Sequence, residues 1–233
     1  GNVLLDRLFG AEIHTYPEGE DEAGADRRLD ELADRMARGG ERPYVIHLSA
    51  DHPPIGALGY VEAAQELVTQ AEAQIVDLGA IVVASGSAQT HAGLLVGLRA
   101  LGRSDVRISG ICVRRTEGVQ AARVIRCVRD TERLLGLERV VPPSDVRVTD
   151  RYLGPGYGRP SPESEEAVLL AARREGLLVD PVYTAKALAG MIGLARAGEL
   201  GERDAVFVHT GGTPALFAYE SPSEPGSGLS SPD

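Results

Sequence analysis

One junction between a strand and a helix constrains most strongly how this chain can fold. An uninterrupted apolar run at residues 80–83 predicts a buried strand, and apolar residues at helical spacing begin at Leu94. The two are joined by the small-residue segment Ala84-Ser85-Gly86-Ser87-Ala88-Gln89-Thr90-His91-Ala92-Gly93. This order places unpaired backbone N–H groups at the N-terminus of a helix, where an anion is stabilised by hydrogen bonds and by the helix dipole.

A phosphate is the natural guest of such a loop. Its glycines allow close approach of the backbone, and Ser85, Ser87 and Thr90 add hydroxyl donors. An ordinary strand-to-helix turn with a Ser or Thr N-cap explains the loop equally well when it is considered alone. The segment matches neither GxGxxG nor GxxxxGK[ST], so dinucleotide-binding and P-loop interpretations have no direct support.

The segments around this junction predict an α/β fold. Strands are expected at residues 80–84, 106–113, 146–148 and 204–209, and helices at 55–73, 92–101, 119–135, 161–174 and a last one ending near 197. Such alternation is typical of a twisted, mostly parallel sheet flanked by helices on both faces. Right-handed crossovers then bring the loops after the strands to one edge of the sheet, which is the usual ligand site in open α/β folds.

The N-terminal part is expected to form a smaller αβαβ unit, with short strands at residues 12–16 and 44–48 and a charged helix at 26–38. After Tyr219 the Ser/Pro/Gly/Glu-rich composition predicts a disordered tail. We therefore expect three parts, which are residues 1–52, 53–219 and 220–233.

Composition excludes several classes of function. A net charge of −10 without a basic run argues against nucleic-acid binding, and no apolar run approaches the roughly 20 residues of a membrane span. Two cysteines are too few for a disulfide framework, so a cytoplasmic protein is expected. The five histidines show no metal-ligand spacing, and no metal site is expected. Lys186 is the sole lysine among 24 basic residues, which limits any mechanism that needs an amine nucleophile.

Two further loops are expected at the same sheet edge as the 85–93 loop. One carries Tyr157 in a Gly/Pro-rich segment and approaches Tyr183, and the other is Thr210-Gly211-Gly212. Phenols can act as general acids or bases where their surroundings shift the pKa. Tyrosine in such a loop is also commonly a packing residue, and Gly-Gly after a strand is commonly a tight turn.

Five segments, taken in order along the chain, have a distinctive sequence. They are Gly1-Asn-Val-Leu-Leu-Asp-Arg-Leu-Phe-Gly-Ala-Glu-Ile13, Gly56-Ala-Leu-Gly-Tyr60, the 85–93 loop, Asp180-Pro-Val-Tyr-Thr-Ala-Lys-Ala-Leu-Ala-Gly190 and Val206-Phe-Val-His-Thr-Gly-Gly-Thr-Pro-Ala-Leu-Phe-Ala-Tyr219. Together they resemble the D-cysteine desulfhydrase and 1-aminocyclopropane-1-carboxylate (ACC) deaminase family of pyridoxal-phosphate enzymes, and the resemblance covers nearly the whole chain to Tyr219. It implies the fold of type II pyridoxal-phosphate enzymes, which is that of the tryptophan synthase β chain. Residues 1–52 would be the remainder of the small domain and 53–219 the cofactor-binding large domain.

The resemblance also implies roles for individual residues. Tyr157 and Tyr183 match the family's two substrate-facing tyrosines. Thr184 and Thr210 match the D-cysteine desulfhydrase branch, because the deaminase branch has Glu and Leu there. Lys186 falls outside the position of the family's cofactor-linked lysine, which lies in an N-terminal portion that this sequence does not contain. The cofactor-binding set would be Ser85, Gly86, Ser87, Ala88, Gln89, Thr90, Thr184, Thr210 and Gly211.

The function that follows from the resemblance is a pyridoxal-phosphate-dependent α,β-elimination on a D-amino acid, with D-cysteine giving pyruvate, sulfide and ammonia. A small amino-acid substrate, a homodimer, and no nucleic-acid or membrane partner are expected with it. ACC deaminase activity is one alternative. An inactive, truncated binding protein of the same fold is the other, and the missing lysine is the feature that favours it.

Overall fold

The computed structural model describes residues 1–17 and 22–219. Its centre is a sheet of four parallel strands in the order β3-β2-β1-β4, which are Arg147–Thr149, Arg107–Cys112, Leu78–Ser85 and Asp204–Phe207. Ile81 of β1 pairs with Ile108 of β2 on one side and with Val206 of β4 on the other. The predicted α/β class with a mostly parallel sheet is therefore confirmed.

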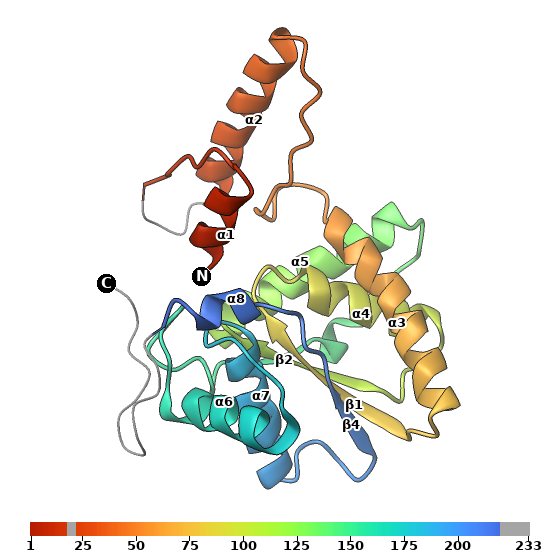
Figure 1. The fold of residues 1–233 in the computed structure, drawn as a ribbon. Coiled ribbons are helices and arrows are strands. Elements are labelled where there is room, and N and C mark those ends of the chain that lie inside the picture. The colour runs from red at the N-terminus through yellow and green to blue at the C-terminus, as the bar shows by residue number, and fades with distance from the viewer. Residues whose placement is uncertain (18–21, 220–233) are drawn as a thin grey trace.

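Helices cover both faces of this sheet (Figure 1). Alternate residues of β1 point to opposite faces, so Ile81 and Val83 pack in one apolar cluster while Ala80 and Val82 pack in another. The first cluster includes α3 (Ile55–Ala73), α4 (Gln89–Ala100) and α5 (Glu117–Leu134). The second includes α7 (Thr184–Arg196), on which α6 (Pro162–Glu175) packs. Burial on both sides explains why β1 is continuously apolar.

Most expected elements form within a few residues of their predicted bounds. The predicted N-cap of α6 is present, because Ser161 Oγ accepts a hydrogen bond from Ser164 N at 3.3 Å and Pro162 occupies the first helical position. A 3-10 turn, Pro143–Asp145, precedes β3, and a short helix α8, Thr213–Leu216, follows β4. No helix in the described ranges is both long and apolar enough to cross a membrane.

The N-terminal part differs from the prediction. It contains two helices, α1 (Asn2–Leu8) and α2 (Glu22–Arg38), which project from one end of the sheet body (Figure 1). The strands expected at residues 12–16 and 44–48 are wrong, because both segments lack strand structure. Tyr44, Ile46 and Leu48 are 82%, 72% and 57% exposed. A strand needs a ladder partner for its backbone groups, and the described residues provide none beside 44–48. The tail predicted as disordered, 220–233, lies outside the described residues.

Candidate functional site

A cavity of about 410 Å³ opens where β1 and β4 end, at the edge predicted to carry the ligand. Its wall combines three loops of the large body with residues of the N-terminal part. The lining residues are Glu22, Leu48, Tyr60, Ala84, Gly86, Ser87, Thr90, Arg114, Arg115, Tyr157, Tyr183, Thr210, Gly211 and Gly212. A larger hollow of about 610 Å³ lies along one face of α3 alone, where polar groups from other elements do not converge.

The β1–α4 loop presents a helix N-terminus to this cavity. Its N-cap residue, Ala88, adopts the left-handed conformation with φ of 79° and provides no side-chain cap. Ala88 therefore offers no side-chain acceptor to the first N–H groups of α4, and Gln89 N donates instead to Ser87 Oγ at 3.4 Å. Gly86, Ser87 and Thr90 line the cavity at this point. Backbone donors, hydroxyl groups and the positive end of the helix together suit a phosphate group.

Three other residues of the predicted phosphate set are absent from the cavity wall. Ser85 is buried, and its Oγ accepts a hydrogen bond from Gln120 Nε2 at 2.9 Å. Ala88 is also buried, and Gln89 borders a smaller neighbouring pocket instead. Ser85 therefore points into the protein interior, and Gln89 points to the neighbouring pocket.

Two residues that the sequence reasoning did not single out support the loop from below. Gln120 Nε2 also donates to Gly86 O at 3.1 Å, and Ser85 Oγ lies 3.4 Å from His91 Nδ1. Burial lowers the pKa of His91 to about 4, so its ring is neutral at neutral pH. The only signal in the sequence was that each is a polar residue on the buried side of its helix, His91 on α4 and Gln120 on α5.

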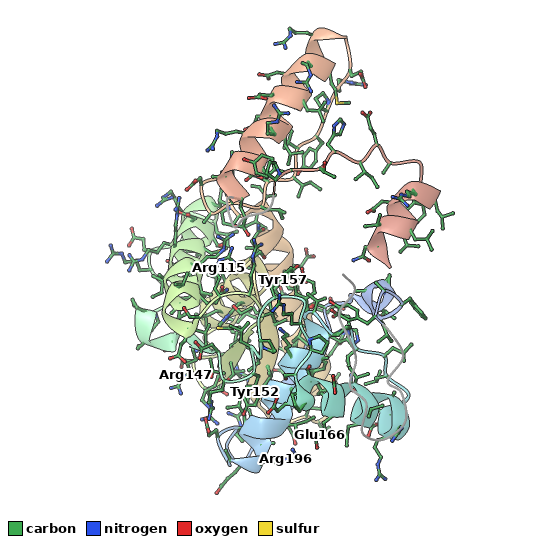
Figure 2. The ribbon with its side chains drawn as sticks, turned by 90° about the vertical axis from the view of Figure 1, so that its left-hand side faces the viewer. Arg115, Arg147, Tyr152, Tyr157, Glu166 and Arg196 are labelled. Atoms are coloured by element: carbon green, nitrogen blue, oxygen red, sulfur yellow. The ribbon has the colours of Figure 1, made fainter. Side chains whose placement is uncertain are left out.

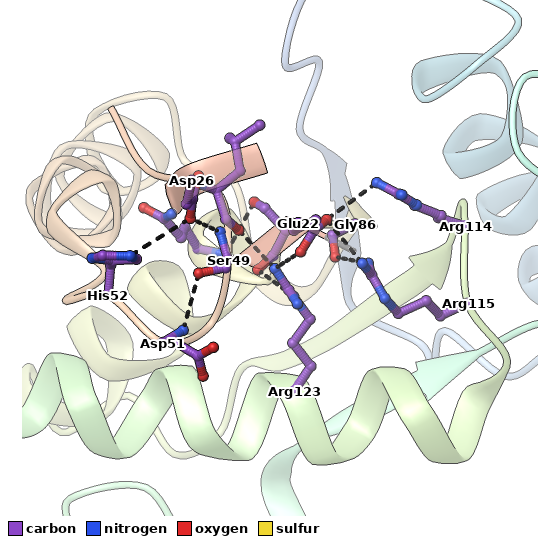
Figure 3. Close-up of polar contacts among 12 residues, drawn as sticks. Glu22, Asp26, Ser49, Asp51, His52, Gly86, Arg114, Arg115 and Arg123 are labelled. Carbon is purple, nitrogen blue, oxygen red and sulfur yellow. Dashed lines mark hydrogen bonds and ion pairs between the residues drawn. The ribbon is translucent and has the colours of Figure 1, made fainter. Parts of the chain in front are cut away.

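Arginines following β2 make the mouth of the cavity basic, and Glu22 of α2 lies among them (Figure 3). Glu22 Oε1 accepts hydrogen bonds from Arg114 at 3.1 Å and from Arg115 at 2.9 Å, while Oε2 accepts one from Arg123 at 2.7 Å. Arg115 and Arg123 also donate to the Gly86 and Ser87 carbonyls, so they remain bound to the loop independently of Glu22. The sequence analysis did not find this cluster.

Replacing Glu22 by glutamine is expected to raise the affinity of the chain for inorganic phosphate. The substitution removes one negative charge from the cavity wall and leaves the arginines in place. We expect about a tenfold gain at low ionic strength, which shrinks as salt screens the charges. Calorimetric titration at two salt concentrations measures both effects. Glu31→Gln, which breaks an exposed ion pair with Arg28, is the matched control. Equal phosphate affinities for Glu22→Gln and the wild type would contradict this electrostatic account.

Tyr157 and Tyr183 form the opposite wall, and their hydroxyl groups are in direct contact. The rings pack edge to face with centroids 5.8 Å apart, and the Arg114 guanidinium lies 5.4 Å from the Tyr157 ring centroid. Burial, followed by the hydrogen bond with Tyr157, raises the pKa of Tyr183 well above its ordinary value. The Tyr183 phenol is thus protonated at neutral pH and suited to donate a hydrogen bond. Figure 2 shows Tyr157 on the same side of the molecule as Arg115.

The Asp180 carboxylate positions Tyr183 by capping α7. Its Oδ2 accepts hydrogen bonds from the backbone N–H groups of Val182 and Tyr183, and its Oδ1 accepts from Thr184 N, each at 2.9 Å. Thr184 Oγ1 donates to Oδ1 at 2.7 Å and accepts from Asp180 N at 2.7 Å. Thr184 is fully buried in this cap and absent from the cavity wall. The structure therefore separates it from Thr210, with which the resemblance groups it.

The turn after β4 supplies the third wall. Thr210 and Gly211 line the cavity together with Gly212, which adopts φ of 88°. A Cβ at Gly212 would come within 2.5 Å of Asp180 Oδ1, so only glycine fits against the cap of α7. His209 has a structural role here, as its Nε2 donates to Leu178 O at 2.8 Å and its Nδ1 accepts from Gly211 N at 3.1 Å.

Lys186 lies behind the wall that Tyr157 forms. Its Nζ donates to Leu153 O at 2.8 Å and to Gly156 O, and the side chain is fully buried. Burial lowers its pKa to about 8. The side chain is absent from the cavity lining, so the geometry shows a residue that supports the Tyr157 loop rather than an exposed nucleophile.

The chain is similar in sequence to known proteins. A family model described as pyridoxal-phosphate-dependent enzyme matches residues 1–211. The D-cysteine desulfhydrases of Salmonella typhi and Klebsiella pneumoniae (strain 342) are each 43% identical to the chain over 220 residues, covering 94% of it. The chain spans 64% of the length of these relatives.

Solved structures show the same similarity. The crystal structure of an ACC deaminase homologue has a TM-score of 0.78 and 39% identity, covering 91% of this chain and 62% of that one. A variant of O-ureido-L-serine synthase with bound O-ureido-L-serine has a TM-score of 0.58 at 18% identity, covering 89% of this chain and 59% of that one, and it shows the fold alone.

Proposed function

Because this chain belongs to the family of pyridoxal-phosphate-dependent enzymes, we propose that it forms the phosphate-binding part of a D-cysteine desulfhydrase-like lyase. The observation that carries the proposal is the 410 Å³ cavity between an uncapped helix N-terminus and two tyrosines. The reaction would be an α,β-elimination on a small D-amino acid, with D-cysteine giving pyruvate, sulfide and ammonia. The 43% identity to enzymes of that name supports this choice.

The residues present fit the phosphate end of the cofactor. The open first turn of α4, with Gly86, Ser87 and Thr90, would bind the phosphate, and the arginines at the mouth add positive charge. Pyridoxal phosphate, when bound, supplies an electron sink for negative charge on the substrate. The tyrosines enclose the other side of the cavity, and Tyr183 holds a proton on its hydroxyl oxygen. The Thr210–Gly212 turn closes the third side.

Replacing Thr90 by valine is expected to weaken pyridoxal phosphate binding about tenfold, because a hydroxyl hydrogen bond to a charged phosphate is worth about 1.5 kcal/mol. Fluorescence titration of the chain with pyridoxal phosphate measures this loss. Pyridoxal, which has no phosphate, should bind equally to the variant and the wild type. Thr69→Val is the matched control, because the Thr69 hydroxyl donates to Gln65 O on the exposed side of α3. A loss of pyridoxal binding as large as that of pyridoxal phosphate would contradict the assignment of Thr90 to the phosphate.

The substrate is tested by assay of the protein. Sulfide release from D-cysteine is expected, whereas 2-oxobutyrate from ACC without sulfide from D-cysteine would favour the deaminase alternative. The structural similarity to an ACC deaminase homologue is the observation that supports this second candidate. Binding of pyridoxal phosphate without turnover of either compound would favour the binding-protein alternative, which the buried position of Lys186 supports.

A further inference from the structure

A cluster of histidine and aspartate side chains lies where α2 packs against the segment that leads to α3. Asp26 and Asp30 lie one turn apart on α2, and His47 and His52 lie in that segment. His47 Nε2 is 2.7 Å from Asp30 Oδ1, and His52 Nε2 is 3.8 Å from Asp26 Oδ2. The two imidazole rings stack with centroids 3.6 Å apart and planes 4° from parallel. One ligand atom each of Asp30, His47 and His52 lies within 4.8 Å of the others.

The charges of this cluster favour a cation. Asp26 is buried and accepts hydrogen bonds from Leu48 N at 3.2 Å and Ser49 N at 2.8 Å, which stabilise its ionised form (Figure 3). The carboxylates of Asp26 and Asp30 together bring a charge of −2 to the cluster, which one divalent cation neutralises.

We propose that Asp30, His47 and His52 bind a divalent transition-metal ion of the zinc type, and that Asp26 orients His52. Imidazole nitrogen with carboxylate oxygen is a preferred zinc ligand set, and three protein ligands leave one position for water. Zinc–nitrogen bonds of about 2.1 Å place neighbouring ligand atoms about 3.4 Å apart. The two imidazole rings, which are stacked in parallel here, must rotate out of the stack so that the ion can lie in the plane of each ring.

Binding requires one change of tautomer. In the present geometry His47 Nε2 donates to Asp30 Oδ1, so an ion bound at Nε2 needs the form of the ring that carries its proton on Nδ1. The histidine spacing did not reveal the site, because the ligands come from a helix and from a separate extended segment. A carboxylate pair one turn apart, followed by two histidines five residues apart, was the signal present in the sequence.

The bound ion would join α2 to the segment before α3, close to the cavity but independent of the cofactor. Arg123 Nη2, which also binds Glu22, donates to Leu48 O at 2.8 Å in that same segment. An ion at Asp30, His47 and His52 would therefore hold α2 and residues 47–52 together beside the cavity mouth. We expect it to raise the melting temperature of the chain.

Titration of the chelator-treated chain with Zn²⁺ alone tests the site. One ion per chain is expected, with Co²⁺ giving the visible absorption bands of a tetrahedral site and Zn²⁺ raising the melting temperature. His47→Gln and His52→Gln are each expected to weaken Zn²⁺ binding at least about tenfold and to abolish the thermal shift. His14→Gln is the matched control, because His14 is an exposed residue paired with Glu12 outside this cluster.

Asp30→Asn keeps the test decisive if a histidine variant fails to fold. Asparagine has the same shape as aspartate and still accepts the hydrogen bond from His47, so this variant should fold. It lacks the charged ligand, so it should bind Zn²⁺ at least about tenfold more weakly. The proposal would be overturned if His14→Gln and Asp30→Asn bound Zn²⁺ equally well. It would also be overturned if more than one ion bound per chain and the His47 and His52 variants bound as the wild type does. Because Zn²⁺ is added without pyridoxal phosphate, this result is separate from that of the cofactor titration.

Discussion

Replacing Gly93 by alanine is expected to lower the free energy of unfolding by about 3 kcal/mol, because α3 and α4 pack with their backbones in contact at this residue. A Cβ at Gly93 would come within 2.3 Å of Ala57 O and 2.6 Å of Tyr60 Cβ. The Ala57 oxygen belongs to the backbone of α3 and cannot rotate away. The two helices must therefore separate, which loses apolar contact along their interface. Urea denaturation followed by circular dichroism measures the loss.

Gly59→Ala is the matched control on the same pair of helices. Gly59 is exposed within α3, and a Cβ there meets nothing within 4 Å. Alanine is the better helix former by about 1 kcal/mol, so this variant should be slightly more stable than the wild type. The two glycine-to-alanine changes are thus expected to have opposite signs. A loss below about 1 kcal/mol for Gly93→Ala would show that α3 and α4 can move apart at little cost.

The Gly93 variant should also bind phosphate ligands more weakly. Gly93 lies in the second turn of α4, three residues after Thr90 of the cavity wall. Displacement of α4 from α3 would move the helix N-terminus relative to Arg114 and Arg115. Phosphate titration of the folded variant tests this coupling between packing and site, whereas Gly59→Ala should leave the affinity unchanged.

Asp180→Ala is expected to lower the free energy of unfolding by about 4 kcal/mol. The substitution removes an acceptor that serves three backbone N–H groups and the Thr184 hydroxyl, and leaves those donors buried. Hydrogen bonds to a charged group contribute about 1.5–3 kcal/mol each, and losses within one cluster are not additive. Asp180→Asn retains one acceptor oxygen and should lose about half as much. Thermal and urea denaturation of both variants measure the series.

Glu166→Gln is the control for removal of a carboxylate. Glu166 forms a two-contact ion pair with Arg196 between α6 and α7, but both side chains are largely exposed (Figure 2). Exposed pairs of this kind contribute about 0–1 kcal/mol, so the variant should unfold nearly as the wild type does. If Asp180→Ala were no more damaging than Glu166→Gln, the cap would not be what holds Tyr183 and Thr184 in place.

The prediction of the fold succeeded where local patterns and burial agree. The continuous apolar run of β1 and the helical spacing in α4 identified the core junction, because a strand buried on both faces has no polar alternation. The same logic failed for residues 44–48. Their composition favours a β-strand, but a strand forms only where a neighbouring strand can pair with it. Among the described residues, Asp26 accepts hydrogen bonds from the backbone N–H groups of Leu48 and Ser49 instead.

The predicted site divides in a similar way. Gly86, Ser87, Thr90, Tyr157, Tyr183, Thr210 and Gly211 do meet at one cavity, as parallel topology requires of loops that follow strands. Ser85 and Thr184 face the interior, where they bond to Gln120 and Asp180. Buried polar groups without a hydrogen-bond partner are costly, and these contacts provide the partners. Glu22 was not foreseen, because its arginine partners are about 90 to 100 residues away in sequence.

By itself, the sequence determined the order of the main strands and helices from residue 55 onward, the position of the loop proposed to bind phosphate, and the motifs that resemble one family of pyridoxal-phosphate enzymes. These properties reside in short segments, where hydrophobic period, glycine and capping residues act locally. Only the tertiary structure decided which hydroxyl groups face the cavity, that Glu22 lies among the arginines, and that Asp30, His47 and His52 meet. Those outcomes depend on side-chain direction and on contacts between distant segments, which become defined only when the elements pack.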